Sequence, residues 1–186
     1  MTAVTNNHRC SWAQASAAMH SYHDEEWGVP QHDSRMLWEM LMLEGFQAGL
    51  AWITVLRKRE AFRAAFAGFD PETVSDFDET DIARLMADAG IIRARATIQA
   101  TIDGARIFCD MQARGESFDD FCWSFTNGKV IQGDGHSLAT VSPLSERMSR
   151  EMKRRGFKFV GPTIVHAFIQ AVGIVDDHSI DCFRRT

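Results

Sequence analysis

Apolar residues recur at helical spacing along most of this chain, and caps, glycines and prolines divide the pattern into segments. Residues 36–43 are apolar on nearly every side, which is typical of a helix buried inside a domain. Further helices are predicted at residues 12–23, 52–66, 71–77, 81–89, 94–114, 117–126, 143–156 and 163–172. No segment shows the alternation of a half-buried strand, so we predict an all-α fold.

The predicted helix starts carry residues that commonly cap helices. Ser11 is expected to cap the first helix and Thr80 the helix at 81–89, because a hydroxyl accepts hydrogen bonds from free N–H groups of the first turn. Asp70 followed by Pro71 has the form of another helix start. Gly90 then stands where a helix end favours a left-handed residue.

Gly90, Ile91 and Ile92 make a very short link between two predicted helices, the pattern of an αα-hairpin. Such a link leaves backbone N–H groups at the start of the second helix, and these can bind a phosphate with help from the charges of Arg93 and Arg95. A hairpin of this kind usually serves packing alone. The sequence leaves both interpretations open.

Residues 43–52 place a carboxylate and an indole around a glycine-rich corner. Glu44 shares a helical face with Leu37 and Leu41, so an isolated carboxylate there needs a partner or a ligand. Trp52 offers a stacking face and one N–H donor. With the hydroxyl of Tyr22, these two side chains could hold a planar heterocycle as a flipped base is held. A helix-terminal glutamate and a core tryptophan are the structural alternative.

Composition and charge narrow the class of protein. The chain has 186 residues, 45% hydrophobic and 24% charged, as expected for one soluble globular unit. The net charge of −5 argues weakly against binding nucleic acid by bulk electrostatics, although the basic residues are clustered and could form a basic face. Because no signal peptide or transmembrane stretch is present, we expect a cytoplasmic protein with no membrane partner and with reduced cysteines.

Two cysteines and two histidines near the chain ends form a candidate metal site: Cys10, His23, His178 and Cys182. Two thiolates and two imidazoles make a closed tetrahedral set suited to structural zinc, with no open position for chemistry. The spacing is only weak support, and unrelated surface histidines and core cysteines remain the alternative.

The chain resembles bacterial 3-methyladenine DNA glycosylase I. The matching segments are YHDEEWGVP (22–30), LEG (43–45), QAGLAWITVL (47–56), DAGIIR (88–93), WSF (123–125) and KRRGFKFVG (153–161). The resemblance implies a monomeric helix-hairpin-helix DNA glycosylase fold with one lobe at about 50–126 and a second built from about 1–49 and 127–186. It also implies zinc at the joined termini, held by the four residues named above.

The family also implies roles for residues of the corner and the hairpin. Glu44 is expected to be the catalytic residue that reads the base, with Trp52 stacking and Tyr22 lining the pocket. Double-stranded alkylated DNA would be bound by Gly49, Leu50, Gly90, Ile91, Ile92 and Arg93. The implied reaction is base-excision repair by hydrolysis of the N-glycosidic bond of 3-methyladenine, releasing the free base.

Two positions depart from the family pattern. Met19, expected to contact the base, stands where an aromatic residue is usual, so one stacking wall becomes a flexible thioether. Phe46 replaces a polar residue and could change how the corner meets DNA. No aspartate is placed to activate water, so we expect a charged Glu44 to select the cationic base. A non-catalytic, zinc-containing helix-hairpin-helix protein that binds damaged DNA is the alternative.

Overall fold

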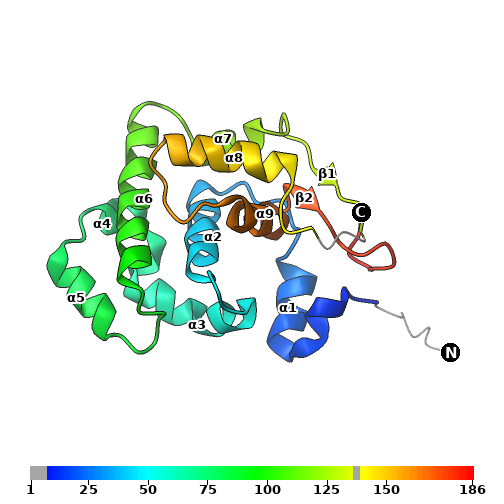
Figure 1. Ribbon diagram of the computed structural model, residues 1–186, viewed down its shortest axis with the longest axis horizontal. Coiled ribbons are helices and arrows are strands. Elements are labelled where there is room, and N and C mark those ends of the chain that lie inside the picture. The colour runs from blue at the N-terminus through cyan, green and yellow to red at the C-terminus, as the bar shows by residue number, and fades with distance from the viewer. Residues whose placement is uncertain (1–7, 136–138) are drawn as a thin grey trace.

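The computed structural model describes residues 8–135 and 139–186, and these residues are mostly helical (Figure 1). The elements in chain order are η1 (Ser11–Ala15), α1 (Ala17–Glu25), α2 (Ser34–Phe46), α3 (Trp52–Ala65), η2 (Ala67–Phe69), α4 (Pro71–Ser75), α5 (Glu79–Ala87), α6 (Arg95–Ala113), α7 (Phe118–Ser124), β1 (Ile131–Gln132), α8 (Pro143–Arg154), α9 (Pro162–Ala171) and β2 (Val175–Asp176). The predicted succession of helices is confirmed, except that the first predicted helix, residues 12–23, is divided into η1 and α1.

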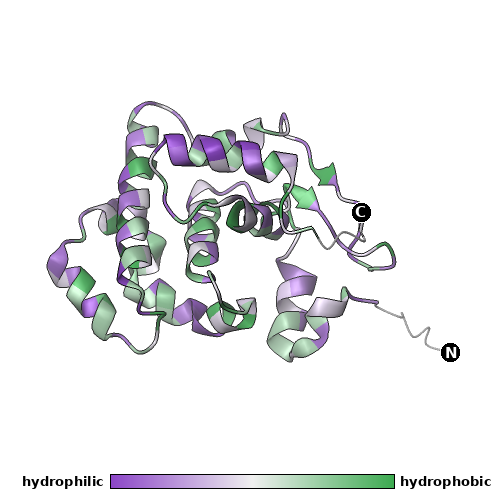
Figure 2. Cartoon of the chain, in the orientation of Figure 1, coloured by the Kyte–Doolittle hydropathy of each residue, from purple (hydrophilic) through white to green (hydrophobic). Residues whose placement is uncertain are grey.

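Helix α2 is the centre of the molecule and contacts α3, α6, α7 and α9 (Figure 1). Leu37, Trp38 and Leu43 of this helix are fully buried, as the sequence pattern predicted, whereas Met36 in its first turn is 40% exposed. Figure 2 shows the hydrophobic colouring concentrated on the central helix α9, whereas the outer helix α8 carries many hydrophilic residues. One continuous cluster of buried apolar side chains extends across both lobes expected from the family resemblance. Amphipathic and buried helices thus enclose a single core.

Phe46 belongs to this core. Its ring centroid lies 4.6 Å from that of Phe62, and only 2% of the residue is exposed. A polar side chain could not occupy this position without an internal partner. The expectation that Phe46 changes the surface of the corner is therefore wrong, because its side chain faces the interior.

Gly90 does not end α5 in a left-handed conformation as predicted, because the helix stops at Ala87 and Gly90 is not among the glycines with positive φ. Two of the predicted N-terminal caps are also wrong. Ser11 opens only η1, and the extended backbone at Ser16 separates this turn from α1, whose first turn Ser16 caps through the N–H of Met19. Helix α5 is capped by Asp78, not Thr80. The Asp78 carboxylate accepts from the N–H groups of Thr80 and Asp81, and the Asp81 side chain completes a capping box. In both cases a second capping residue lies close by, and the contacts of the first turn select it.

The structure also contains a strand pair that the sequence did not predict. Strands β1 and β2 are parallel, with Ile131 opposite Val175 and Gln132 opposite Asp176. Two residues are too few to show an alternating pattern, and the partners lie 44 positions apart in the chain. This pairing holds the C-terminal segment against the loop that precedes α8.

The C-terminal segment also meets the start of the described chain. The Phe183 N–H donates to the carbonyl of His8, and the Ser179 N–H donates to Sγ of Cys10. Within the described ranges, no helix has the length and apolar character needed to cross a bilayer.

Candidate active site

Glu44 lies in the last turn of α2, which continues to Phe46 instead of ending at the glutamate. Only 3% of the residue is exposed, and its Oε2 atom has no hydrogen-bond partner among the described residues. Burial without a compensating charge raises the pKa of Glu44 to about 8. Without a cationic base beside it, the carboxyl is therefore mostly protonated at neutral pH, which differs from the negatively charged Glu44 expected from the sequence.

A cavity of about 290 Å³ adjoins Glu44. Its walls come from η1, α1, α2, α3 and α9 and the segments between them: Trp12, Met19, Tyr22, Trp27, Glu44, Gln47, Trp52, Ala167 and Gln170. Most of this lining is aromatic or apolar, with a few polar groups, the usual composition of a small-molecule site. The fold thus brings together the four residues predicted to form a base pocket, Met19, Tyr22, Glu44 and Trp52.

Tyr22 and Trp52 form adjoining walls of the pocket. Their ring centroids are 5.4 Å apart and the ring planes are inclined by 42°. Trp52 Nε1 is buried without a hydrogen-bond partner in the described part of the chain. Burial, followed by the nearby Glu44, raises the pKa of the Tyr22 hydroxyl well above its ordinary value, so Tyr22 stays a neutral donor and acceptor. The pocket therefore holds aromatic surfaces and polar atoms without internal partners.

Two further tryptophans line the cavity, and neither was assigned to it from the sequence. Trp12 lies in η1, and Trp27 follows α1, with 4.9 Å between their ring centroids. Trp27 stands inside one of the segments that carry the family resemblance, which was the available signal. Trp12 offered none, because its position depends on the break at Ser16.

The glycine corner is a turn between α2 and α3. Gly49 has a φ of 77°, which only glycine adopts without strain, and no atom lies within 4 Å of the position of an added Cβ. Leu50 is 42% exposed. The corner therefore presents open backbone and an apolar side chain beside the pocket wall at Trp52.

The predicted hairpin lies between α5 and α6, and its link runs from residue 88 to 94, longer than the three residues expected. Ile91 is buried and Ile92 is packed against the core, so these two side chains anchor the hairpin. Arg93 is exposed, and Arg95 forms an ion pair with Glu79. Of the residues proposed to contact phosphate here, only Arg93 offers an exposed side chain without a carboxylate partner among the residues described.

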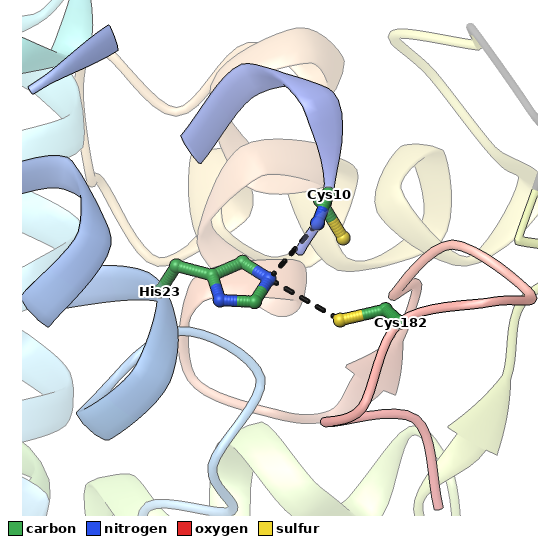
Figure 3. A group of neighbouring side chains, drawn as sticks. All are labelled: Cys10, His23 and Cys182. Carbon is green, nitrogen blue, oxygen red and sulfur yellow. Dashed lines mark hydrogen bonds between the residues drawn. The ribbon is translucent and has the colours of Figure 1, made fainter. Parts of the chain in front are cut away.

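Three of the four predicted metal ligands converge. Cys10, His23 and Cys182 are buried, and one potential ligand atom of each lies within 4.8 Å of the others (Figure 3). His23 Nδ1 is 2.8 Å from Asp24 Oδ1, which leaves Nε2 directed at Cys10 and Cys182. An imidazole that donates through one nitrogen to a carboxylate is the usual form of a metal-binding histidine.

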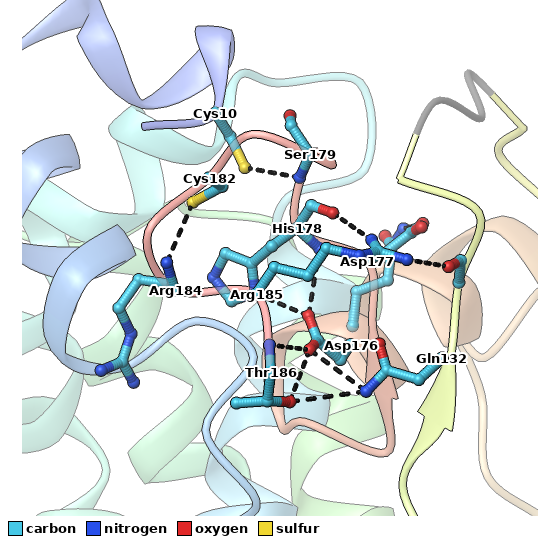
Figure 4. A network of polar contacts seen from close by, with 12 residues as sticks. Cys10, Gln132, Asp176, Asp177, His178, Ser179, Cys182, Arg184, Arg185 and Thr186 are labelled. Carbon is cyan, nitrogen blue, oxygen red and sulfur yellow. Dashed lines mark hydrogen bonds and ion pairs between the residues drawn. The ribbon is translucent and has the colours of Figure 1, made fainter. Parts of the chain in front are cut away.

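His178 lies beside this group but is not part of it in the structure. Its ring centroid is 5.2 Å from that of His23, and Nδ1 is 2.8 Å from Asp176 Oδ1 (Figure 4). Nε2 of His178 is buried with no hydrogen-bond partner in the described residues. Burial raises the pKa of Asp176, but hydrogen bonds from His178 and Thr186 outweigh this effect and lower the pKa to about 2. Two thiols and two imidazoles that are each oriented by a carboxylate fit the chemistry of a tetrahedral metal site, although only three of the four residues converge in the structure.

Comparison with known proteins places this geometry in a family. The methyladenine glycosylase family matches residues 12–185. DNA-3-methyladenine glycosylase 1 of Escherichia coli (strain K12) is 50% identical over 177 residues, which cover 94% of this chain and 95% of that protein. Sequence similarity therefore extends over nearly the whole of both chains.

Solved structures agree with this comparison. A crystal structure of 3-methyladenine DNA glycosylase I matches with a TM-score of 0.94 at 48% identity, covering 96% of this chain and 100% of that chain. The 3-methyladenine DNA glycosylase I from Staphylococcus aureus, whose structure concerns 3-methyladenine recognition, matches with a TM-score of 0.90 at 36% identity and covers 96% of both chains. This chain belongs to the methyladenine glycosylase family.

Proposed function

We propose that this protein is a DNA-3-methyladenine glycosylase that hydrolyses the N-glycosidic bond of 3-methyladenine in alkylated DNA, the first step of base-excision repair. The relatives that it matches over almost their full length carry this name. One structural observation supports assigning the activity to this site. Glu44 is buried, its Oε2 atom has no hydrogen-bond partner among the described residues, and it lines an aromatic cavity. The non-catalytic alternative is not favoured by these relatives.

The pocket has the chemistry needed to hold a flipped purine. Trp52 and Tyr22 offer aromatic surfaces against which a planar base can stack, and base–aromatic stacking is worth about 1–3 kcal/mol per base. Glu44 can accept a hydrogen bond from the exocyclic amino group. Met19 supplies an adaptable thioether wall.

Selectivity for the damaged base follows from charge. N3-methylation leaves a cationic base, and such a cation placed beside Glu44 favours loss of the carboxyl proton. The ion pair then forms inside an apolar site, where it is stronger than in water. A neutral adenine does not favour ionisation of Glu44, so the carboxyl stays protonated and no ion pair forms. Neutral adenine is therefore bound more weakly.

The reaction itself needs little acid catalysis. Departure of the base neutralises its positive charge, so the bond to deoxyribose is weak from the start, and water attacks the sugar as the bond breaks. Asp103 and Asp110 lie on α6, and neither lines the cavity at Glu44, so neither is placed to act on water there. The pocket contributes by holding and selecting the base.

DNA would meet the protein at the corner and the hairpin. Gly49 and Leu50 lie beside the pocket wall and could support the gap left by the flipped nucleotide. The helix-hairpin-helix arrangement of α5 and α6 would bind backbone phosphate through the link that contains Gly90, Ile91, Ile92 and Arg93.

Cys10, His23, His178 and Cys182 would hold a structural zinc ion. The orphaned Nε2 atom of His178 and the carboxylate on each Nδ1 support this set. Zinc with four protein ligands would supply cross-linking of the chain ends and no catalysis.

Release of free base from methylated DNA is the direct test. Wild-type protein should release 3-methyladenine, whereas Glu44→Gln should release it at least about tenfold more slowly, with unchanged circular dichroism. Glu60→Gln, an exposed glutamate on α3, is the control and should match the wild type. Duplex binding by the wild type without base release would instead support the non-catalytic alternative, and full activity of Glu44→Gln would remove its assigned role.

A further inference from the structure

Lys58 on α3 is bonded to the hairpin. Its Nζ atom donates to the carbonyl of Ala89 at 3.0 Å and to the carbonyl of Gly90 at 3.1 Å. The side chain is half-buried and forms no ion pair with a carboxylate in the described chain. One half-buried ammonium group therefore holds two main-chain oxygens at the tip of the hairpin.

A second contact fixes the same tip to the same helix. Ala61, one turn after Lys58 on α3, lies so close to Gly90 that an added Cβ there would be 3.1 Å from the Ala61 Cβ. The Gly90 N–H is occupied by the Asp88 carboxylate at 2.7 Å. The hairpin thus rests on one face of α3, with its carbonyls turned toward Lys58.

Helix α3 also supplies one wall of the base pocket, through Trp52. It begins at Trp52, six residues before Lys58, which corresponds to about 9 Å along a helix axis. The spacing between the stacking wall and the hairpin is therefore set by a single rigid element. A duplex that puts its phosphate on the hairpin and its base in the pocket must match this spacing.

The charges near the hairpin favour phosphate. Lys58 and Arg93 form no ion pair among the residues described, unlike Arg95, which pairs with Glu79. The N–H groups of Ile92 and Arg93 donate to no atom in that part of the structure. With the carbonyls held by Lys58, the hairpin offers donors and positive charge.

We propose that Lys58 is a positioning residue for DNA binding, which holds the hairpin at a fixed distance from the base pocket so that one duplex engages both. This inference rests on the proposed function. Lys58 acts through the Ala89 and Gly90 carbonyls, and it does not contact the base.

Lys58→Met and Lys58→Gln test the proposal, with Arg57→Met as the matched control. Arg57 is the neighbouring cation on α3, is exposed, and has no carboxylate partner among the described residues. We expect Lys58→Met to weaken binding of a duplex containing an abasic site by roughly tenfold, the scale of one charge-assisted hydrogen bond. Arg57→Met should weaken it by less than about threefold, as an exposed phosphate contact does. Lys58→Arg should restore most of the affinity.

Binding of free 3-methyladenine, followed by tryptophan fluorescence, separates positioning from a general structural role. It should be the same in wild type and all variants, because the pocket is intact. Equal duplex affinity of the Lys58 and Arg57 variants overturns the proposal, and so does a parallel loss of free-base affinity. Release of base by the wild type tests the proposed function separately, since duplex and free-base binding are measured without turnover.

Discussion

At the scale of single residues, two buried glutamates on α2 show how pairing separates structure from function. Glu39 and Glu44 are each 3% exposed. Glu39 accepts from Arg35 and Arg63, both at 2.7 Å, whereas Glu44 has no partner in the described residues. A buried carboxylate without a counter-charge lowers the stability of the fold, so its presence indicates a ligand.

The raised pKa of Glu44 predicts a pH-dependent gain in stability for Glu44→Gln. Folding raises the pKa of Glu44 from its ordinary value of 4.5 to about 8. Below pH 4.5 the carboxyl is protonated in both the folded and the unfolded protein, so it does not lower the free energy of unfolding. As the pH rises from 4.5 toward 8, the unfolded protein loses this proton while the folded protein keeps it, and the free energy of unfolding falls. Glu44→Gln cannot ionise and should be more stable than the wild type by on the order of 2–4 kcal/mol at pH 8, with little difference at pH 4.5.

Urea unfolding of both proteins at the two pH values measures this difference. The other titratable groups change the free energy of unfolding equally in both proteins, because the two chains differ only at residue 44. A Glu44→Gln protein that is less stable than the wild type at pH 8 would contradict the assignment of an uncompensated carboxyl.

At the scale of elements, the end of α9 is locked onto the segment before α2. Backbone N–H groups of Gly28 and Gln31 donate to the carbonyls of Ala171 and Val172. Gly173 follows with a φ of 72°, and an added Cβ would lie 2.5 Å from backbone atoms of Val29 and Pro30. This close approach aligns α9, whose Ala167 and Gln170 line the pocket.

Gly173→Ala should therefore destabilise the protein far more than Gly115→Ala. Gly115 has almost the same φ, 74°, but no atom lies within 4 Å of its added Cβ. Conformational strain alone should lower stability by about 1 kcal/mol at Gly115. At Gly173 the backbone must also move, and a loss of about 3 kcal/mol or more is expected. Thermal unfolding of both variants checks this, and equal losses would show that the contact with Val29 and Pro30 is unimportant.

At the scale of the whole molecule, the two ends of the chain are joined at one place. Cys10, from the start of the described residues, and Cys182, near the C-terminus, lie with His23 in one buried group. The proposed zinc ion would cross-link residues far apart in sequence, which would restrict the unfolded chain and stabilise the fold. The ends also carry Trp12, so this junction supports a wall of the pocket.

Purified wild-type protein should contain about one zinc ion per chain, and Cys182→Ser should lose it. A strong chelator should lower the Tm of the wild type by roughly 5 °C or more, and should have no further effect on Cys182→Ser. Cys122→Ser is the control, because Cys122 is equally buried but lies outside the group. Zinc-free wild-type protein whose Tm does not respond to added zinc would contradict the proposed site.

The sequence alone determined the helical architecture and the buried position of α2, because helical periodicity and local caps are properties of neighbouring residues. It also named Tyr22, Glu44 and Trp52 as one group, through chemistry and family resemblance. Contacts between distant segments decided the rest: the pairing of β1 with β2 and the entry of Trp12 into the pocket. The same holds for Glu44, since only the packed structure shows that no counter-charge reaches it and that its pKa is raised. Local patterns fix elements, whereas burial and pairing depend on what the rest of the chain brings alongside.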